Sequence, residues 1–375
     1  SSNIYKFSYF GKISNLAKSK IKNVEFTNYC ISKKKNYNFM IEVGIIGFGV
    51  VGQRRKKYIL ENKSYNLCCV SDTSFKKDYK TKKINFYQDY KKFIKHELDA
   101  VFITLPNYLA VKVTSFFLKK NIHVFCEKPP ARNFKELKSL EKILNKNKRL
   151  KLKYGFNHRY HGSVKKAENL INSKTYGKII NLRAVYGKSK IVTFGKNEWR
   201  ANRKFSGGGI LLDQGIHLLD LITKFGGKFD KFKSFISNSY WGYDVEDNAF
   251  AIMKNEKKNI IASIHSTATQ WEHKFSLEIT LEKALIVLSG ILSGTKSYGK
   301  EKITIISKPV FNKNNKKKVY QFYKDFSWRL EIEEFAKIIN YNMKVKTGSY
   351  QDALNVMRMI DKIYLSDVEW YKKFR

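Results

Sequence analysis

The sequence predicts two folded domains: an α/β domain on a parallel sheet over residues 40–150, and an α+β domain over residues 151–375. Apolar segments of strand and helix character alternate in the first region, as in parallel sheets with crossover helices. In the second region, apolar and polar residues alternate with a period of two, which favours a large, mostly antiparallel, open-faced sheet. The 375 residues are enough for each domain to bury its own core.

Residues 1–39 precede both domains as a basic N-terminal extension with a single acid, Glu25, and little periodicity. Met40 then opens the first buried strand. Two interpretations remain open. Either the extension is appended and Met40 is the natural initiator, or the extension is a basic arm that packs on a partner subunit.

The predicted strands of the first domain are short and apolar, and we expect them to be buried on both faces of the sheet. They cover residues 43–46, 66–70, 84–86, 100–104 and 121–126. Helices are expected after the first strand through Lys57 and Tyr58, over 111–118, and over 134–145, where the last helix closes the domain.

The predicted strands of the second domain cover residues 179–186, 232–237, 249–253, 260–265, 275–280, 284–288 and 303–306. Helices are expected over 164–171, 210–225, 330–339 and 353–365. The first two of these helices should cover one face of the sheet. The other face is expected to carry Ile260, Ala262 and Ile264, an apolar surface that a second subunit would bury. We therefore predict a homodimer or a homotetramer.

The formal net charge of +41 would suit nucleic acid or an anionic membrane as a partner. The lysines are nevertheless scattered along the chain with only short clusters, such as 33–35 and 316–318, and Asn, Ile, Tyr and Phe are abundant too. This profile favours a drift toward A/T-rich codons. The sequence also has no apolar run of about 18 residues and no secretory signal pattern. Neither nucleic acid nor a membrane is therefore an expected partner.

The cysteines lack the spacing of metal ligands; they are Cys30, Cys68, Cys69 and Cys126. Two of them are adjacent in an apolar run, where a small buried thiol is the usual interpretation. We therefore expect no metal site and a reduced, cytoplasmic location.

A glycine-rich motif follows the first strand and opens a helix, which is the setting in which such a motif indicates dinucleotide binding. Its residues are Gly47, Phe48, Gly49, Val50, Val51 and Gly52. Gly47 permits a tight turn, Gly49 leaves room for a pyrophosphate, and Gly52 lets the helix pack close to the strand. This pattern predicts a Rossmann domain.

Asp72 ends the second strand, about twenty residues after the last glycine of this motif. A carboxylate there can accept hydrogen bonds from both ribose hydroxyls and repels a 2′-phosphate, so NAD is the predicted cofactor. Lys76 and Lys77 could reach a 2′-phosphate, which keeps NADP possible. A simple N-cap role for Asp72 is a further alternative.

Lys128 stands at the carboxyl end of a predicted parallel strand, the edge at which open α/β sheets bind ligands. Pro129 fixes the backbone directly after it and so limits where the ammonium group can point. A lysine in this position could hydrogen-bond a substrate oxygen and assist proton transfer.

A second polar set follows the glycines 207–209, on a helix that is otherwise apolar. Asp213 and His217 are four residues apart, so an α-helix would place them on one face. Burying an acid and an imidazole together costs free energy unless they serve a site or a buried network. The carboxylate could orient the imidazole, whose pKa suits proton transfer, and a purely structural pair is the alternative. Asp220 continues this face and is expected to cap the helix or pair with a basic group.

In their order along the chain, these motifs resemble the Gfo/Idh/MocA family of oxidoreductases over residues 40 to about 365. The further motifs that carry the resemblance are Leu105-Pro106-Asn107, Glu127-Lys128-Pro129, Asn157-His158-Arg159-Tyr160 and Trp199-Arg200. The resemblance implies that Lys128, Asp213 and His217 are catalytic and that Arg159 and Tyr160 contact the substrate. The cofactor contacts that it implies are the glycine motif, Asp72, Leu105, Pro106, Asn107, Glu127, Lys128, Trp199 and Arg200. One departure is Ala110, at a position where many members have a histidine.

The implied reaction is hydride transfer between a nicotinamide and a carbinol carbon of a sugar, cyclitol or nucleotide sugar, with surface-polysaccharide metabolism as a possible context. In it, His217 exchanges the hydroxyl proton, Lys128 polarises the same oxygen, and Asp213 orients His217 or the substrate. Two alternatives remain: an NAD-dependent glycosidase of the same fold, and a dinucleotide-sensing regulator without catalysis. A regulator need not keep a proton-transfer set, which argues against the second alternative.

Overall fold

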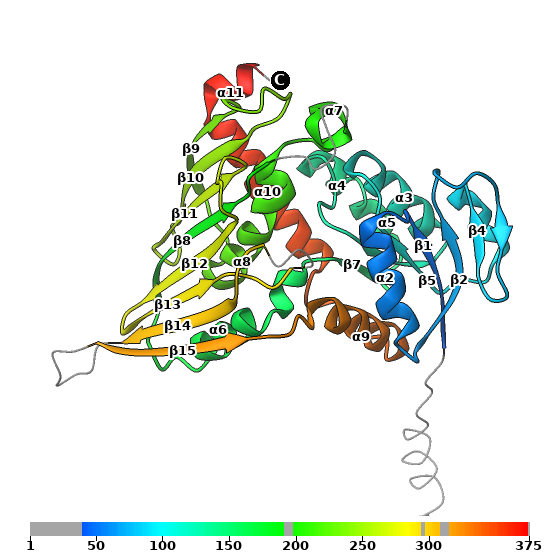
Figure 1. Ribbon diagram of the computed structural model, residues 1–375, viewed down its shortest axis with the longest axis horizontal. Coiled ribbons are helices and arrows are strands. Elements are labelled where there is room, and N and C mark those ends of the chain that lie inside the picture. Colours follow the sequence, from blue (N-terminus) through cyan, green and yellow to red (C-terminus); the bar gives the residue numbers. More distant parts are fainter. Residues whose placement is uncertain (1–39, 191–197, 294–296, 308–314, 374–375) are drawn as a thin grey trace, which may run out of the picture. The chain divides into compact units, whose positions relative to one another are not determined.

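The computed structural model describes residues 40–190, 198–293, 297–307 and 315–373. The basic extension over residues 1–39 lies outside the described residues. Two sheets organise the described part of the chain (Figure 1). Within that part, no helix combines the length and the apolar character needed to cross a membrane.

The first sheet has seven strands in the order β3-β4-β2-β1-β5-β6-β7. Their bounds are β1 Ile41–Ile46, β2 Tyr65–Ser71, β3 Tyr79–Lys80, β4 Asn85–Tyr87, β5 Ala100–Ile103, β6 His123–Cys126 and β7 Leu152–Tyr154. All neighbours pair in parallel except β3 and β4, so the predicted parallel sheet is confirmed. The sequence did not indicate β3 or β7. Strand β7, which belongs to this sheet, lies after residue 150.

Helices bury both faces of this sheet, which explains why its central strands are apolar throughout. On one face lie α2 (Val50–Leu60) and α9 (Ser327–Asn340), and α3 (Asn107–Lys119) lies on the other. The ring of Phe335 in α9 packs edge-on against that of Phe102 in β5, with centroids 5.7 Å apart. The chain therefore returns to its first sheet after building the second. The domain boundaries expected from the sequence had assigned α9 wholly to the second domain.

The second sheet has eight strands in the order β15-β14-β13-β12-β8-β11-β10-β9. Their bounds are β8 Ile179–Gly187, β9 Lys231–Ser237, β10 Asn248–Asn255, β11 Ile260–Thr267, β12 Lys274–Leu281, β13 Ala284–Ser289, β14 Glu301–Ser307 and β15 Lys316–Phe322. Among these pairs β8 and β11 are parallel and the others antiparallel, which confirms the predicted, mostly antiparallel sheet.

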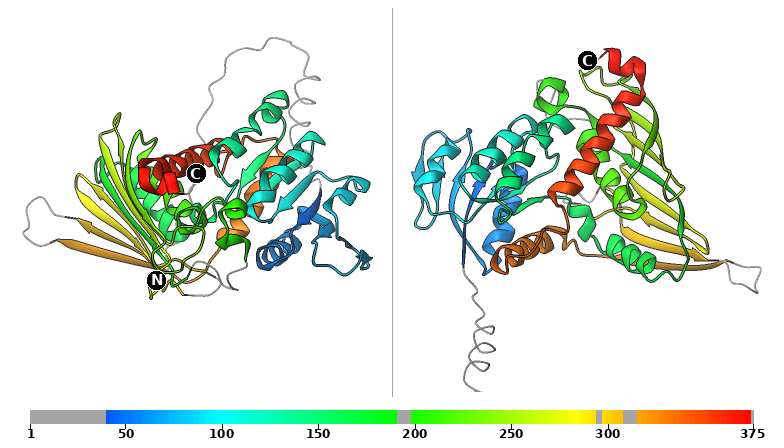
Figure 2. Two further views of the ribbon diagram at one scale, coloured as in Figure 1. Left: turned by 90° about the horizontal axis from the view of Figure 1, so that it is seen from above. Right: turned by 180° about the vertical axis from the view of Figure 1, so that it is seen from behind.

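Helices α6 (Gly162–Asn172), α8 (Ile216–Gly226) and α10 (Tyr350–Ser366) pack on one face of the second sheet. Figure 2 shows α10 running along this face, while no described helix lies on the opposite face. The remaining helical segments are η1 Tyr90–Lys95, α4 Phe134–Lys138, α5 Glu141–Lys146, η2 Asn157–Tyr160, η3 Trp199–Ala201, α7 Arg203–Ser206, η4 Leu211–Gly215 and α11 Val368–Lys373.

The structure corrects the assignment of residues to the two faces of the second sheet. Ile260, Ala262 and Ile264, expected on the open face, are buried in the core beneath α8. The open face instead carries apolar side chains that alternate with them or lie on neighbouring strands; these are Phe235, Phe250, Ile252 and Ile261. A period of two defines two faces but not which of them is inward, and a shift of one residue exchanges them.

Two further differences have simple local causes. The helix expected over 134–145 is broken into α4 and α5 around Ser139, whose hydroxyl donates to the carbonyl of Glu136 and competes with helical pairing. The sequence did not indicate the edge strand β15, which carries the lysine run at 316–318. Lysine is a common residue on exposed edges because its charge opposes pairing with another chain.

Candidate active site

The predicted cofactor residues follow the carboxyl ends of four neighbouring parallel strands, where open α/β sheets bind ligands. The glycine motif follows β1, Asp72 follows β2, Asn107 begins α3 after β5, and Lys128 follows β6. The backbone N–H of Phe48 donates to Oδ2 of Asp72 at 2.5 Å, which joins the glycine turn to this acid. Partial burial would raise the pKa of Asp72, but hydrogen bonds from Ser74 and Phe48 hold it below its ordinary value.

The glycine turn has the shape that a dinucleotide requires. A Cβ on Gly52 would lie 2.1 Å from the carbonyl oxygen of Gly47, so the first turn of α2 closes only with glycine there. A Cβ on Gly49 would meet no atom within 4 Å, so open space lies beside the N-terminus of α2. Unpaired N–H groups and the positive end of the helix dipole favour a phosphate at such a place. The residues present therefore fit the cofactor that the motif predicts.

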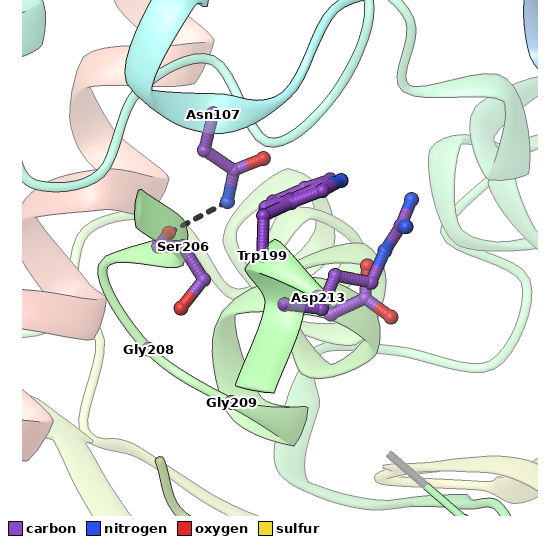
Figure 3. Close-up of a pocket in the computed structure, with 7 residues that line it drawn as sticks. Asn107, Trp199, Ser206, Gly208, Gly209 and Asp213 are labelled. Carbon is purple, nitrogen blue, oxygen red and sulfur yellow. Dashed lines mark hydrogen bonds between the residues drawn. The ribbon is translucent and has the colours of Figure 1, made fainter. Parts of the chain in front are cut away.

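A pocket lies where the segment before α8 meets the first sheet's loops (Figure 3). It is lined by Asn107, Trp199, Arg200, Ser206, Gly208, Gly209 and Asp213. Nδ2 of Asn107 donates to the carbonyl of Ser206 at 2.7 Å and so ties α3 to the glycine run. The guanidinium of Arg200 lies over the ring of Trp199 at 4.3 Å. Four residues predicted from the sequence thus meet in one pocket: Asn107, Trp199, Arg200 and Asp213.

Lys128, which follows β6, contacts Asp213, one of the residues that line this pocket. Its Nζ donates to the backbone carbonyl of Asp213 at 2.7 Å and lies 3.8 Å from Oδ1 of the same residue. Burial lowers the pKa of Lys128, and the nearby Asp213 charge acts in the opposite direction. Burial alone would raise the pKa of Asp213, but the positive charge of Lys128 and of two further cations holds it well below its ordinary value. The carboxylate is therefore ionised beside the ammonium group.

His217 lies at the start of α8 and is only 4% exposed. Burial, followed by the charge of Lys128, lowers its pKa well below the ordinary value, so the imidazole is neutral at pH 7. A neutral imidazole can accept a proton, which is what a general base must do. Its Nδ1 is buried and has no hydrogen-bond partner among the described residues. Its ring lies parallel to that of His158, with centroids 3.7 Å apart.

The segment that carries Asp213 differs from the α-helix expected from the sequence. Residues Leu211–Gly215 form a π-helical turn before α8, a feature frequently found at functional sites. Asp213 contacts Gln214 at 2.8 Å and Lys128, and no hydrogen bond to His217 is among its described contacts. The carboxylate is therefore placed to hold Lys128 rather than to orient the imidazole.

Glu246 was not identified as important from the sequence, although it secures the start of this segment. Its buried carboxylate accepts hydrogen bonds from the backbone N–H groups of Gly209 at 2.7 Å and Leu211 at 3.0 Å. The hydroxyl of Tyr364 donates to the same carboxylate at 2.7 Å. An acid at the beginning of a helical segment satisfies N–H groups that have no partner within the helix. Its distance along the chain from residues 207–215 hides this link from the sequence.

Three predicted site residues have their polar atoms engaged elsewhere. Arg159 makes two hydrogen bonds to Asp220, at 2.7 and 2.6 Å, as expected for a basic partner of that acid. Tyr160 accepts from Lys153 at 2.8 Å and donates to a glutamate of α9. The carboxylate of Glu127 pairs with Arg55 inside the first domain. None of the three is among the residues that line the pocket.

The described residues contain no group of three or more His, Cys, Asp or Glu side chains that could hold a metal ion. Cys69 and Cys126 are buried, and burial raises the pKa of the Cys126 thiol to about 12. A thiol with so high a pKa is a poor ligand and a poor nucleophile. Cys30 lies outside the described residues.

Comparison with protein families matches both parts of this chain. Residues 41–156 match a model described as an oxidoreductase family with an NAD-binding Rossmann fold, and residues 164–287 match a GFO/IDH/MocA C-terminal domain. The two matches together cover more than half of the chain. They fall on the two sheets described above.

Two curated relatives carry sugar dehydrogenase names. Levoglucosan dehydrogenase of Pseudarthrobacter phenanthrenivorans is 26% identical over 142 residues, which is 38% of this chain and 36% of the relative. D-glucoside 3-dehydrogenase of Escherichia coli is 26% identical over 182 residues, which is 44% of this chain and 50% of the relative. The matched region therefore spans half or less of each relative.

Solved structures extend the likeness to most of the chain. A levoglucosan dehydrogenase in complex with NADH superposes with a TM-score of 0.76 at 18% identity, covering 88% of this chain and 97% of the other. At this identity the likeness shows that the two proteins share a fold.

Proposed function

Because the chain belongs to the GFO/IDH/MocA family of oxidoreductases, whose first domain is an NAD-binding Rossmann fold, we propose that it is an NAD-dependent sugar dehydrogenase. The substrate class is a sugar, cyclitol or nucleotide sugar that is oxidised or reduced at a carbinol carbon. The observation that supports this proposal is the contact of Lys128, which follows β6, with Asp213, together with the effect of the Lys128 charge on the pKa of the buried His217.

Each of these residues has a distinct part in the proposed chemistry. The neutral imidazole of His217 accepts the hydroxyl proton during oxidation and returns it during reduction. The Lys128 ammonium group donates to the same substrate oxygen and stabilises the negative charge that develops there. Asp213 keeps Lys128 charged and in place. The nicotinamide, when bound, supplies or takes up the hydride.

The glycine turn and Asp72 would hold the cofactor. The N-terminus of α2 would bind the phosphates, and the Asp72 carboxylate would accept hydrogen bonds from the ribose hydroxyls. Asn107, Trp199 and Arg200 line the pocket in which the reacting ring and the substrate would meet. Ligand pockets of this kind combine an apolar wall with a few placed polar groups.

A screen of sugars, cyclitols and nucleotide sugars with NAD, followed by absorbance of the reduced nicotinamide, tests the proposal. We expect net accumulation of NADH with at least one polyol. An NAD-dependent glycosidase returns its hydride in every turnover, so cleavage of a glycoside without net NADH would instead establish that alternative. Binding of NAD without turnover of any carbohydrate would favour the other alternative, a dinucleotide-sensing regulator without catalysis.

Asp72 should set the preference for NAD over NADP. In the unmodified protein NADH should bind more tightly than NADPH. Asp72→Ala should weaken the binding of NADH by about tenfold, which is the effect of losing one charge-assisted hydrogen bond. NADPH affinity should fall less, because the repulsion of the 2′-phosphate is lost as well. Fluorescence titration measures both constants. Asp99→Ala is the matched control, since Asp99 accepts from Glu42 at the opposite edge of the sheet. Tighter NADPH binding by the unmodified protein would contradict the assignment.

We also propose a homo-oligomer that buries the open face of the second sheet. Phe235 is 82% exposed and Ile252 60% exposed there, an apolar surface that a partner subunit would remove from water. Light scattering should give the mass of a dimer or a tetramer. Ile252→Asp should shift the mass toward the monomer, while Leu60→Asp, at an exposed leucine of α2, should leave it unchanged. A monomeric mass for the unmodified protein at micromolar concentration would exclude this assembly.

A further inference from the structure

His217 lacks the contact that usually orients a catalytic histidine. In most such sites, one ring nitrogen donates to a carboxylate or a carbonyl, and this bond fixes both the tautomer and the plane of the ring. Here Nδ1 of His217 is buried without a hydrogen-bond partner among the described residues. Asp213, the acid expected to supply that bond, holds Lys128 instead. Another group must therefore fix the plane of the ring.

The ring of His158 lies on the face of His217. The two centroids are 3.7 Å apart and the planes are inclined by 14°, which is the separation of rings in van der Waals contact. His158 belongs to η2, directly after β7, whereas His217 belongs to α8. Because β7 pairs with β6, the strand that ends beside Lys128, His158 comes from the same edge of the sheet as Lys128.

His158 is itself held rigidly. Its Nδ1 lies 3.1 Å from Oδ1 of Asn157, and because an amide oxygen only accepts, this nitrogen carries the hydrogen. Its Nε2 lies 3.3 Å from the hydroxyl of Tyr186 and accepts from it when the ring is neutral. Nδ2 of Asn157 in turn donates to Ser327 at 3.2 Å. Both ring nitrogens of His158 thus have partners, and its plane is fixed from two sides.

We infer that His158 is a positioning residue, which sets the plane of the His217 ring by stacking on it. The inference rests on the proposed function, since it assigns His158 a part in orienting the proton acceptor. Loss of the stacked ring lets His217 rotate in a pocket where no hydrogen bond restrains Nδ1. Misplacing a reacting group by about 1 Å can lower the rate by two orders of magnitude.

The test compares His158→Leu, which removes the flat ring, with His158→Phe, which keeps it. We expect His158→Leu to lower kcat by roughly tenfold, with the substrate KM and the dissociation constant of NADH changed less than twofold. His158→Phe should recover most of this loss. Phe275→Leu is the control, because Phe275 packs edge-on against His158 at 5.7 Å without stacking on His217. Its kcat should stay within about twofold of the unmodified value.

A second measurement is independent of activity. In protein labelled with isotopes at histidine, the His217 ring signals are identified by their absence in His217→Ala. The stacked ring should shift them by its ring current, and this shift should vanish in His158→Leu and persist in His158→Phe. Equal losses of kcat in the Leu and Phe variants, or His217 signals that do not respond to His158→Leu, would overturn the inference. If no carbohydrate is oxidised at all, the proposed function fails while the ring signals still decide whether His158 orients His217.

Discussion

His217→Ala should lower kcat by about a hundredfold or more, because the variant loses the group that we propose as the acceptor of the substrate's hydroxyl proton. Cofactor affinity should change little, since no cofactor contact is assigned to this buried imidazole. Steady-state kinetics with the substrate found by the screen, together with NADH titration, measure both quantities. His123→Asn is the matched control because His123 begins β6 at the opposite edge of the first sheet. Near-normal turnover in His217→Ala would show that the catalytic assignment is wrong, although the fold would stand.

The other two members of the set should differ in their pH dependence. Lys128→Met should lower turnover at every pH, because it removes the ammonium group that we propose to stabilise charge on the substrate oxygen. In Asp213→Asn the lysine remains but loses the neighbouring charge that raises its pKa. The pKa of Lys128, already lowered by burial, should fall further, so the alkaline limb of the kcat profile should move to lower pH. An unchanged alkaline limb in Asp213→Asn would show that Lys128 does not have to be protonated.

Local patterns in the sequence were enough to predict most elements of the fold. The glycine motif, read together with the apolar strand before it, identified β1 and α2 at nearly their observed bounds. Strands such as β10 followed from strict alternation of apolar and polar residues. The same alternation could not reveal which face is inward, since this depends on where α8 packs. Nor could a local pattern reveal that α9 covers the first sheet, because its partners there, Phe102 and Phe125, are more than two hundred residues away along the chain.

In the candidate site, too, local motifs identified single residues, whereas contacts between distant residues could not be predicted. Lys128 and Asp213 could be named from the sequence because each lies in a local motif whose setting indicates chemistry. Their mutual contact, a lysine on the backbone carbonyl of Asp213, could not be deduced, since the spacing of Asp213 and His217 suggested a direct pair. His158 had no signal beyond its place in a motif. Its importance comes from a ring contact with a residue on another element, which only the three-dimensional arrangement reveals.

The buried ion pairs of Arg55 with Glu127 and Glu331 also join residues that are far apart in the sequence. Among the changes considered, we expect the loss of Arg55 to have the largest effect on stability. Nη2 of Arg55 lies 2.5 Å from Oε1 of Glu127 and 2.7 Å from Oε2 of Glu331, and its side chain is fully buried. The guanidinium also lies over the rings of Phe125 and Trp328, at 4.4 and 4.3 Å from their centroids. Arg55 of α2 therefore links two segments: the loop after β6, in which Lys128 lies, and helix α9.

Arg55→Met should destabilise the protein by about 3–5 kcal/mol at pH 9, because it leaves two carboxylates buried without their cation. Urea unfolding measures this free energy. Arg329→Met is the control, since Arg329 pairs with Glu333 on the exposed side of α9 and its replacement should change the stability far less than Arg55→Met. Adding Glu331→Gln to Arg55→Met should restore part of the loss, because it removes one of the two unpaired charges.

The loss of unfolding free energy in Arg55→Met should depend on pH, and the titration of Glu331 determines the direction of this dependence. Burial raises its pKa to about 7, against the opposing effect of Arg55. Without Arg55 the pKa of the folded state rises further, while that of the unfolded state stays near its ordinary value. As the pH falls from 9 toward 7, the carboxyl group of the folded variant binds a proton before that of the unmodified protein does, and the buried charge disappears. The difference in unfolding free energy between the variant and the unmodified protein should therefore shrink over this range. An equal difference at both pH values would mean that lost packing, and not unpaired charge, destabilises the variant.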